Sequence, residues 1–311
     1  MSKTKATISK GKRRFSNKQL MLISAVLTSI IILGLVLSFI FLKKPNKFSL
    51  NAAIIDQIGE NFPSNSTMAQ EFNETSTSIL EQAGFSVAYH RHEIVTVSFF
   101  KELAKRDYGI IILRAHYAKR SSETEVDIFT SEEYRDGVYD YVSRGNYTWE
   151  PSKFYFAITP DFIKHLDGSF PKSIIIAMGC WSLKSGYEEM ADAFIQKGAT
   201  AYIGWTEEVD IGHSDKETIR LLRMLLEEEK SIADAVGYVA HDWTFFPYES
   251  YMTFYPHTDI IGNLKISDLI EEAKASSNLQ GMIASFKLAP VLCMTFMWLK
   301  RKILDLACQP L

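Results

Sequence analysis

The sequence contains little cysteine, three residues in 311, and only Cys180 falls in the region expected to fold as a domain. Cys293 and Cys308 lie near the C-terminus. A single cysteine cannot form an internal disulfide, which excludes the disulfide scaffolds of small secreted domains. The spacing of histidine, cysteine and carboxylate residues matches no zinc or calcium motif, and the glycines form no phosphate-binding loop. We therefore expect no metal and no cofactor.

Acidic residues are absent from the first 47 positions, which contain ten lysines and arginines. The rest of the chain has 24 basic and 37 acidic residues, a net charge of −13. Nucleic-acid phosphates would be repelled by such a charge. The composition therefore argues against a nucleic-acid partner for the region beyond residue 47.

Residues 20–42 contain no charged side chain. About 20 apolar residues can cross a bilayer as a helix, so we predict a transmembrane helix over 20–42. Seven basic residues precede this run and three follow it, which places segment 1–19 in the cytoplasm and the main domain outside the cell membrane. The alternative is a cleaved secretory signal, but such signals have a shorter apolar stretch and a small-residue cleavage site. The lipid bilayer is thus one expected partner.

Three sequons follow this apolar run. They begin at Asn65, Asn73 and Asn146. Each predicts an N-glycosylation site, which is consistent with an external surface.

Short apolar runs alternate with segments of helical periodicity within residues 48–265. The strand-like runs are 52–58, 85–89, 108–113, 173–178 and 200–205, and the helical segments are 68–82, 99–105, 187–197, 214–229 and 231–242. Continuous isoleucine-rich runs separated by helices are typical of a parallel sheet covered on both faces. The predicted class is α/β, with a doubly wound, mainly parallel sheet.

Two regions depart from this alternation. Residues 118–158 hold short, aromatic-rich alternating segments, which predict an antiparallel insertion, and Thr159-Pro160 then indicates a helix start. Residues 266–311 form a helical, apolar C-terminal tail. Its most apolar part, 282–299, is interrupted by Lys287 and Pro290. A second span is one interpretation, and an interfacial or domain-packing helix is the favoured one.

Two reactive side chains follow predicted strands. His116 comes after YGIIILRA, and Cys180 comes after SIIIAMG. Ligand and catalytic sites of open parallel sheets lie beyond the carboxyl ends of the strands. If the two strands are neighbours, a thiol and an imidazole meet there, as nucleophilic catalysis requires. Gly179 would allow a tight turn before Cys180, whose backbone N–H would stabilise an oxyanion. The alternative is a buried, inert cysteine and an unrelated histidine.

The segments IILRAHY, IIIAMGCWSL and MADAFIQKGATAYIGW resemble the caspase-like fold of clan CD cysteine peptidases, closest to the gingipain-like and CHAT-type branches. The resemblance covers roughly residues 52–242. It implies that His116 is a general base and Cys180 a nucleophile that hydrolyses peptide bonds through an acyl-enzyme. A peptide or protein would be the substrate. The family usually has glycine after the histidine, with its N–H in the oxyanion hole, whereas Tyr117 stands here.

The resemblance also indicates a substrate pocket near Trp205, Glu207 and Glu208, because this region borders the pocket for the residue before the cut in gingipain-like enzymes. Acidic residues there would favour lysine or arginine in the substrate. A solvated acidic loop is the alternative. The bulk of Tyr117 and Trp181 leaves an alternative function open as well, a catalytically inactive caspase-like module that binds or senses at the cell surface. The sequence favours no particular oligomeric state.

Overall fold

The computed structural model describes residues 47–59, 66–120 and 124–285, and six positions within the predicted anchor: Met21, Val26, Thr28, Ser29, Ile32 and Gly34. The chain divides into two compact units, Met1–Pro45 and Asn46–Leu311. In the described part of the chain, no helix is long and apolar enough to cross a membrane. Most of the predicted anchor and most of segment 282–299 lie outside the described residues, so both spans stay predictions.

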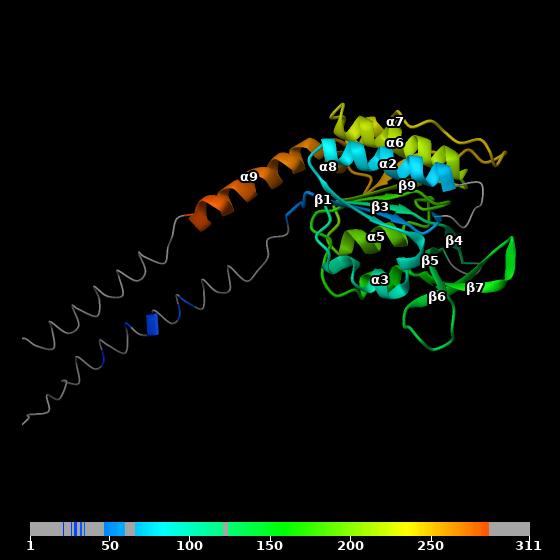
Figure 1. Ribbon diagram of the computed structural model, residues 1–311, viewed down its shortest axis with the longest axis horizontal. Helices are drawn as coiled ribbons and strands as arrows, with labels where there is room; N and C mark the ends of the chain where they lie inside the picture. The colour runs from blue at the N-terminus through cyan, green and yellow to red at the C-terminus, as the bar shows by residue number, and fades with distance from the viewer. Residues whose placement is uncertain are drawn as a thin grey trace, which may run out of the picture. The chain divides into compact units, whose positions relative to one another are not determined.

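A six-stranded sheet forms the centre of the second unit, in the order β10-β9-β8-β3-β1-β2 (Figure 1). Its strands are β1 Asn51–Asp56, β2 Ser86–His90, β3 Ile110–Arg114, β8 Ile174–Ala177, β9 Ala201–Trp205 and β10 Met252–Tyr255. All neighbouring strands are parallel except β9 and β10, which are antiparallel. The predicted mainly parallel sheet is confirmed, whereas β10 was not expected from the sequence.

Helices cover both faces of this sheet (Figure 1). Successive side chains of a strand point to opposite faces, and Ile54 and Ile55 accordingly lie in two different hydrophobic clusters. The cluster of Ile54 includes side chains of α2 Ser66–Gln82, α6 Ile211–Leu226, α7 Ile232–Gly237 and α9 Ile266–Ser285. The cluster of Ile55 includes side chains of α3 Val97–Lys101, α4 Pro160–Lys164 and α5 Glu189–Gln196. The structure is thus a mixed α/β fold with a mostly parallel sheet, and this division is compatible with the predicted doubly wound arrangement.

Several helices begin where the sequence supplies a capping side chain. Thr159 Oγ1 accepts from the N–H of Phe162, with proline at the first position of α4. Ser231 and Asp210 cap α7 and α6 in the same way. A capping oxygen satisfies a backbone N–H that has no partner inside the helix. The prediction of a helix start at Thr159-Pro160 is therefore confirmed.

Three predicted helices are wrong in extent. The helix predicted over 214–229 is α6, which begins at Ile211 and ends at Leu226. The helix predicted over 231–242 ends at Gly237, because Asp242 instead pairs with Ser250 through two backbone hydrogen bonds. The helix predicted over 99–105 is two pieces, α3 and the 3₁₀ helix η3 Leu103–Lys105. Two further short helices, η2 His92–Ile94 and α8 Asp259–Gly262, were not predicted.

The predicted antiparallel insertion is a four-stranded sheet in the order β4-β5-β7-β6. Its strands are β4 Tyr117–Lys119, β5 Val126–Glu133, β6 Val142–Tyr147 and β7 Glu150–Ile158. Every pair in it is antiparallel. Because β4 starts immediately after His116, this histidine lies at the junction of the two sheets.

Candidate active site

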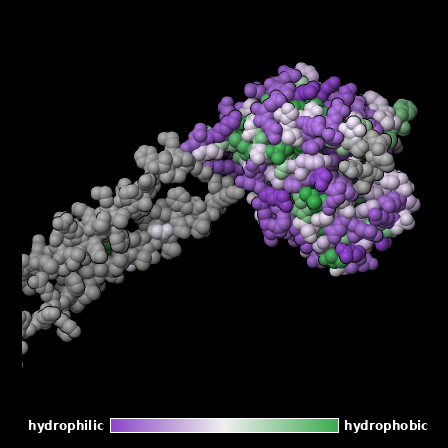
Figure 2. Space-filling model, viewed as in Figure 1, coloured by the Kyte–Doolittle hydropathy of each residue, from purple (hydrophilic) through white to green (hydrophobic). Residues whose placement is uncertain are grey.

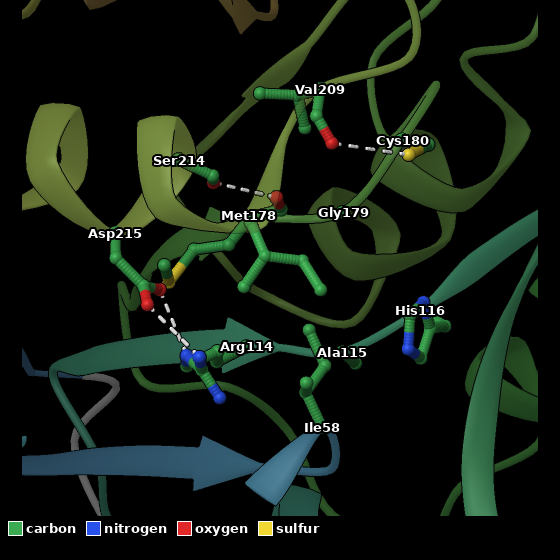
Figure 3. Close-up of a pocket in the computed structure, with 11 residues that line it drawn as sticks. Ile58, Arg114, Ala115, His116, Met178, Gly179, Cys180, Val209, Ser214 and Asp215 are labelled. Atoms are coloured by element: carbon green, nitrogen blue, oxygen red, sulfur yellow. Dashed lines mark hydrogen bonds and ion pairs between the residues drawn. The ribbon is translucent and has the colours of Figure 1, made fainter. Parts of the chain in front are cut away.

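The cavity of interest lies at the carboxyl ends of β3 and β8. These strands are parallel neighbours, with Leu113 opposite Ala177, so the predicted adjacency is confirmed. His116 follows β3 and Cys180 follows β8, and both line this cavity (Figure 3). The other lining residues are Ile58, Arg114, Ala115, Met178, Gly179, Val209, Ile211, Ser214 and Asp215.

The space between these walls is small. Its volume is about 20 Å³, roughly enough for one water molecule. Val209 and Ile211, which follow β9, form one wall, and Ile58, which follows β1, forms another. This volume is too small to hold a peptide side chain.

Cys180 is half-buried, and its Sγ lies 3.7 Å from the carbonyl oxygen of Val209 (Figure 3). Burial raises the pKa of the thiol, and the negative charges of Glu208 and Asp242 act in the same direction, while the Val209 contact opposes them. A buried thiolate beside carboxylates is costly because desolvation and like charge both disfavour it. The cysteine is therefore a neutral thiol near pH 7.

His116 is also held neutral. Burial, followed by the positive charge of Arg114 and by His92, lowers the pKa of its imidazole to about 4. The ring packs against Tyr147 and Trp149, with centroid separations of 5.0 and 5.5 Å. A neutral imidazole has one nitrogen that accepts a proton. His116 can therefore act as a base near pH 7, while the low pKa limits its strength.

The backbone next to His116 is shaped by strand pairing. Tyr117 lies opposite Ile128, and the N–H of Phe129 donates to the carbonyl of His116. In an antiparallel ladder this pattern makes Tyr117–Ile128 a non-hydrogen-bonded pair, so the Tyr117 N–H points away from β5. Tyr117 has the extended backbone of a strand, which needs no glycine. The N–H of Tyr117 thus lies outside the ladder.

Gly179 is needed for close packing. A Cβ at this position would lie 2.1 Å from Cδ2 of Tyr117 and 2.4 Å from the carbonyl oxygen of Ala115. The residue with a left-handed backbone in this turn is not Gly179 but Trp181, whose φ is 55°. Such a conformation is uncommon for a bulky residue. Its N–H donates to the carbonyl of Glu207, so the turn after Cys180 is fixed to the loop that follows β9.

The residues predicted to form a substrate pocket lie outside the cavity lining. Trp205 is fully buried in the core, and its indole N–H donates to Ser214 Oγ at 3.0 Å. Glu207 is half-buried and forms an ion pair with Lys184. Glu208 is also half-buried. From this loop it is Val209 that reaches the cavity.

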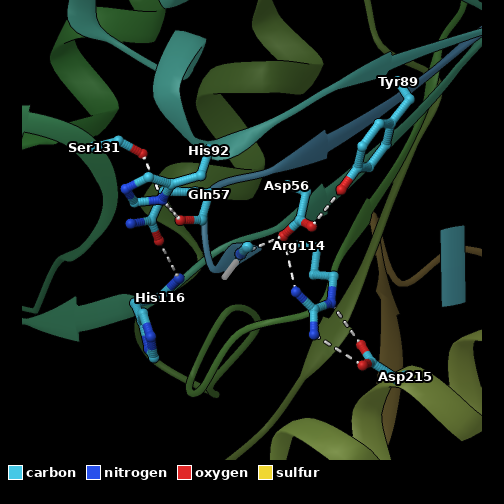
Figure 4. A network of polar contacts seen from close by, with 9 residues as sticks. Asp56, Gln57, Tyr89, His92, Arg114, His116, Ser131 and Asp215 are labelled. Atoms are coloured by element: carbon cyan, nitrogen blue, oxygen red, sulfur yellow. Dashed lines mark hydrogen bonds and ion pairs between the residues drawn. The ribbon is translucent and has the colours of Figure 1, made fainter. Parts of the chain in front are cut away.

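A buried ionic network that the sequence analysis missed adjoins the site (Figure 4). Arg114 is fully buried, and its guanidinium donates to Asp56 at 2.8 Å and to both carboxylate oxygens of Asp215 at 2.8 and 2.9 Å. Tyr89 donates its hydroxyl to Asp56. Burial alone would lower the pKa of Arg114, but the hydrogen bonds and charges of Asp215 and Asp56 raise it above its ordinary value. The signal in the sequence was arginine directly after IIIL, since a buried charge needs a partner.

A second set of polar contacts holds the segment before β4. Gln57 is fully buried; its side-chain oxygen accepts from the N–H of His116 at 3.0 Å, and its amide donates to the hydroxyl of Tyr147 at 2.8 Å. His92 contacts the carbonyl of Gln57 and, at 2.9 Å, the hydroxyl of Ser131 (Figure 4). Gln57 thus links His116 to the insertion that covers its ring.

The sequons fall in different settings. Asn73 is half-buried on α2 and accepts from Thr77 Oγ1 at 3.3 Å. Asn146 is exposed on β6. Asn65 lies outside the described residues. Within those described ranges, no group of three or more potential ligands that could hold a metal ion is present.

Comparison with known proteins adds no further identification. No protein-family model and no curated protein sequence matches the chain.

Proposed function

We propose that the second unit is a cysteine peptidase with a caspase-like fold, located outside the cytoplasm and anchored to the cell membrane by residues 20–42. The observation that carries the proposal is the convergence of His116 and Cys180 on one cavity, at the carboxyl ends of adjacent parallel strands. Sites of parallel α/β sheets lie at this edge. The resemblance of the surrounding sequence to clan CD peptidases supports peptide-bond hydrolysis over other acyl transfers.

The proposed reaction starts from a neutral thiol and a neutral imidazole. His116 takes the Sγ proton as the sulfur of Cys180 attacks the substrate carbonyl carbon. The N–H groups of Cys180 and Tyr117 are the proposed donors to the resulting oxyanion. The C–N bond then breaks, and the leaving amine takes the proton from His116. Water hydrolyses the thioester with His116 as base, which regenerates the thiol.

A second function is a catalytically inactive caspase-like module that binds or senses a ligand at the cell surface. One observation favours it: the cavity at the pair has a volume of only about 20 Å³, and the Sγ of Cys180 contacts the carbonyl of Val209. As a peptidase, the protein must turn Sγ from that carbonyl toward the substrate.

The deciding experiment is cleavage of a mixed peptide library by the purified full-length chain in detergent. We expect Cys180→Ala and His116→Ala each to reduce turnover by at least about 10³-fold, as loss of a nucleophile or its base does. Cys308→Ala and His257→Ala are matched controls that should retain full turnover. Undiminished cleavage by Cys180→Ala would refute the proposal. Absence of cleavage by the unmutated chain would favour the binding module.

A further inference from the structure

Trp149 is an exposed aromatic residue beside His116. It lies in the turn that joins β6 to β7, and 55% of the residue is exposed. The centroid of its ring lies 5.5 Å from that of the imidazole. Figure 2 shows a mostly hydrophilic face with scattered hydrophobic residues, and a single exposed apolar side chain on such a surface needs no explanation by itself. The position next to the proposed catalytic base is what distinguishes Trp149.

A stack of rings holds Trp149 in place. Its indole is nearly parallel to the ring of Tyr147, with an interplanar angle of 7° and centroids 4.7 Å apart. Tyr147 is buried and stacks in turn on Phe129, at a centroid separation of 5.0 Å. The fully buried Gln57 donates its side-chain amide to the Tyr147 hydroxyl at 2.8 Å. The exposed ring therefore rests on ordered, buried side chains, and an ordered surface loses little conformational entropy when a ligand binds.

The chemistry of His116 defines which part of a substrate lies near this ring. In the proposed reaction the acyl part of the substrate becomes attached to Cys180, whereas the leaving amine takes its proton from His116. Proton transfer requires hydrogen-bond reach, about 2.6–3.2 Å. The residue after the cut is bonded to that amine nitrogen, so its side chain starts at the neighbouring Cα. Trp149, whose ring packs against the imidazole, is therefore within reach of the side chain after the cut.

The charges that act on His116 disfavour a cationic side chain at this position. Arg114 and His92 both lower the pKa of the imidazole, as nearby positive charge does. A lysine or arginine of the substrate placed beside His116 would meet the same positive charge. An uncharged side chain avoids this cost.

The carboxylate next to Trp149 does not reverse this preference. Glu150 is half-buried, and it accepts from the hydroxyl of Tyr155 at 2.8 Å. The ammonium of Lys153 lies 5.0 Å from the centroid of the same tyrosine ring, and it is attracted to Glu150. The charge of Glu150 is thus already compensated. Aromatic rings pack favourably on one another in stacked or edge-to-face geometries, so an aromatic side chain is the ligand that suits Trp149.

We propose that Trp149 is a specificity-determining residue that binds an aromatic side chain of a polypeptide beside His116. The ring of a phenylalanine, tyrosine or tryptophan packs on the exposed part of the indole. Assigning this side chain to the residue after the cut rests on the proposed peptidase function, whereas the ring contact itself does not.

The first measurement identifies the residue after each cut when the full-length chain cleaves the mixed peptide library. Trp149→Ala removes the ring, and Trp149→Phe keeps an aromatic ring at the same position. Trp243→Ala is the matched control, because it removes the same side chain, 54% exposed, from the segment between α7 and β10. A ratio of cuts within one variant is insensitive to partial unfolding, which lowers all cuts alike.

We expect the unmutated chain to cut about tenfold more often before aromatic residues than before alanine or serine, because packing of a ring adds to burial of its area. This preference should disappear in Trp149→Ala and persist in Trp149→Phe and Trp243→Ala. A preference retained by Trp149→Ala would overturn the proposal. An equal loss of all cuts would also overturn it, since Trp149 would then only support His116.

The second measurement needs no turnover. The full-length chain with Cys180→Ala is labelled with 5-fluorotryptophan, and the fluorine-19 signal that disappears on addition of Trp149→Ala is that of Trp149. The probe is N-acetylphenylalaninamide, and N-acetylalaninamide, which lacks only the ring, is its control. We expect the probe to shift the Trp149 signal at least about fivefold more than the control does at equal concentration, because of the ring contact. Equal shifts would contradict the proposed contact.

The two proposals fail separately. If the unmutated chain cleaves the library without a preference for aromatic residues after the cut, only the role of Trp149 is refuted. If the unmutated chain cleaves nothing, the peptidase is refuted, and the fluorine signal alone decides whether Trp149 binds aromatic side chains.

Discussion

His116 and Cys180 are both held neutral by their burial, and this sets the chemistry of the pair. The pKa of the imidazole is lowered to about 4, and the pKa of the thiol is raised. Proton transfer from thiol to imidazole is therefore uphill. Opening the cavity to solvent would weaken both desolvation effects and bring the two pKa values closer together.

The buried imidazole predicts a pH-dependent stability. Its pKa is about 4 in the folded chain and about 6.5 when unfolded. Between these values the unfolded state binds more protons, so the free energy of unfolding should fall as pH drops from about 6.5 to about 4. His116→Gln should show a shallower fall of the unfolding free energy over this range. Denaturant unfolding at several pH values measures the slopes. Equal slopes for the parent and His116→Gln would contradict the lowered pKa.

Arg114 predicts a large loss of stability on substitution. Arg114→Leu leaves the carboxylates of Asp56 and Asp215 buried without their cation. Removing one partner of a buried ion pair lowers the free energy of unfolding by about 3–5 kcal/mol. Arg135→Leu is the control, because its guanidinium is largely exposed and it pairs with Glu132 at 3.8 Å; an exposed pair contributes about 0–1 kcal/mol. Urea titration compares the two variants, and similar losses would rule out a stabilising role for the network.

At the scale of elements, the sheet was predictable because its strands are short isoleucine-rich runs with clear stops. Gly84 and Gly198 follow α2 and α5 with φ of 98° and 104°, the left-handed conformation that ends helices. β10 was missed because its four residues pair antiparallel with β9 and form no long apolar run. The end of α7 at Gly237 was missed because a helical spacing of apolar residues does not reveal the competing Asp242–Ser250 pairing.

The candidate pair was predictable for the same reason as the sheet, since each residue directly follows a buried strand. The Arg114 network was not, because its partners are 58 and 101 residues away in the sequence. Local patterns contain no information about which distant carboxylate meets a given guanidinium. The cavity volume was also beyond prediction, because it depends on how Ile58 and Val209 pack across the strand ends.

The close contact between β4 and the turn after β8 predicts an effect of Gly179→Ala. The added Cβ would overlap Tyr117 and the backbone of Ala115. We therefore expect the free energy of unfolding to fall by about 1–3 kcal/mol, as it does at other overpacked sites. Gly237→Ala at the end of α7 is the matched control, with open space around its Cβ. It should be neutral or stabilise by up to about 1 kcal/mol. Thermal unfolding of both variants measures the difference, and a neutral Gly179→Ala would show that the two segments separate easily.

For the orientation of the whole molecule in a membrane, the distribution of charge along the chain matters more than the net charge. The net charge is −3. Every charged side chain in the first 47 residues is nevertheless basic, and the rest of the chain has more acidic than basic residues. Basic residues are retained on the cytoplasmic side of a membrane, and acidic residues contribute little to orientation. The seven basic residues before segment 20–42 should therefore decide which end crosses the bilayer.

This predicts the orientation of the chain in a cell. With an epitope tag at the N-terminus and another at the C-terminus of the second unit, protease added outside intact cells should digest the region after Lys47 and spare the first eighteen residues. The N-terminal tag should then remain on a short membrane-bound fragment. Detergent permeabilisation is the control and should expose both tags. Replacing the seven basic residues before the apolar run with glutamine leaves only three, on its far side, and should invert part of the population. Protection of the second unit in intact cells would contradict the topology and, with it, the proposed location of the peptidase.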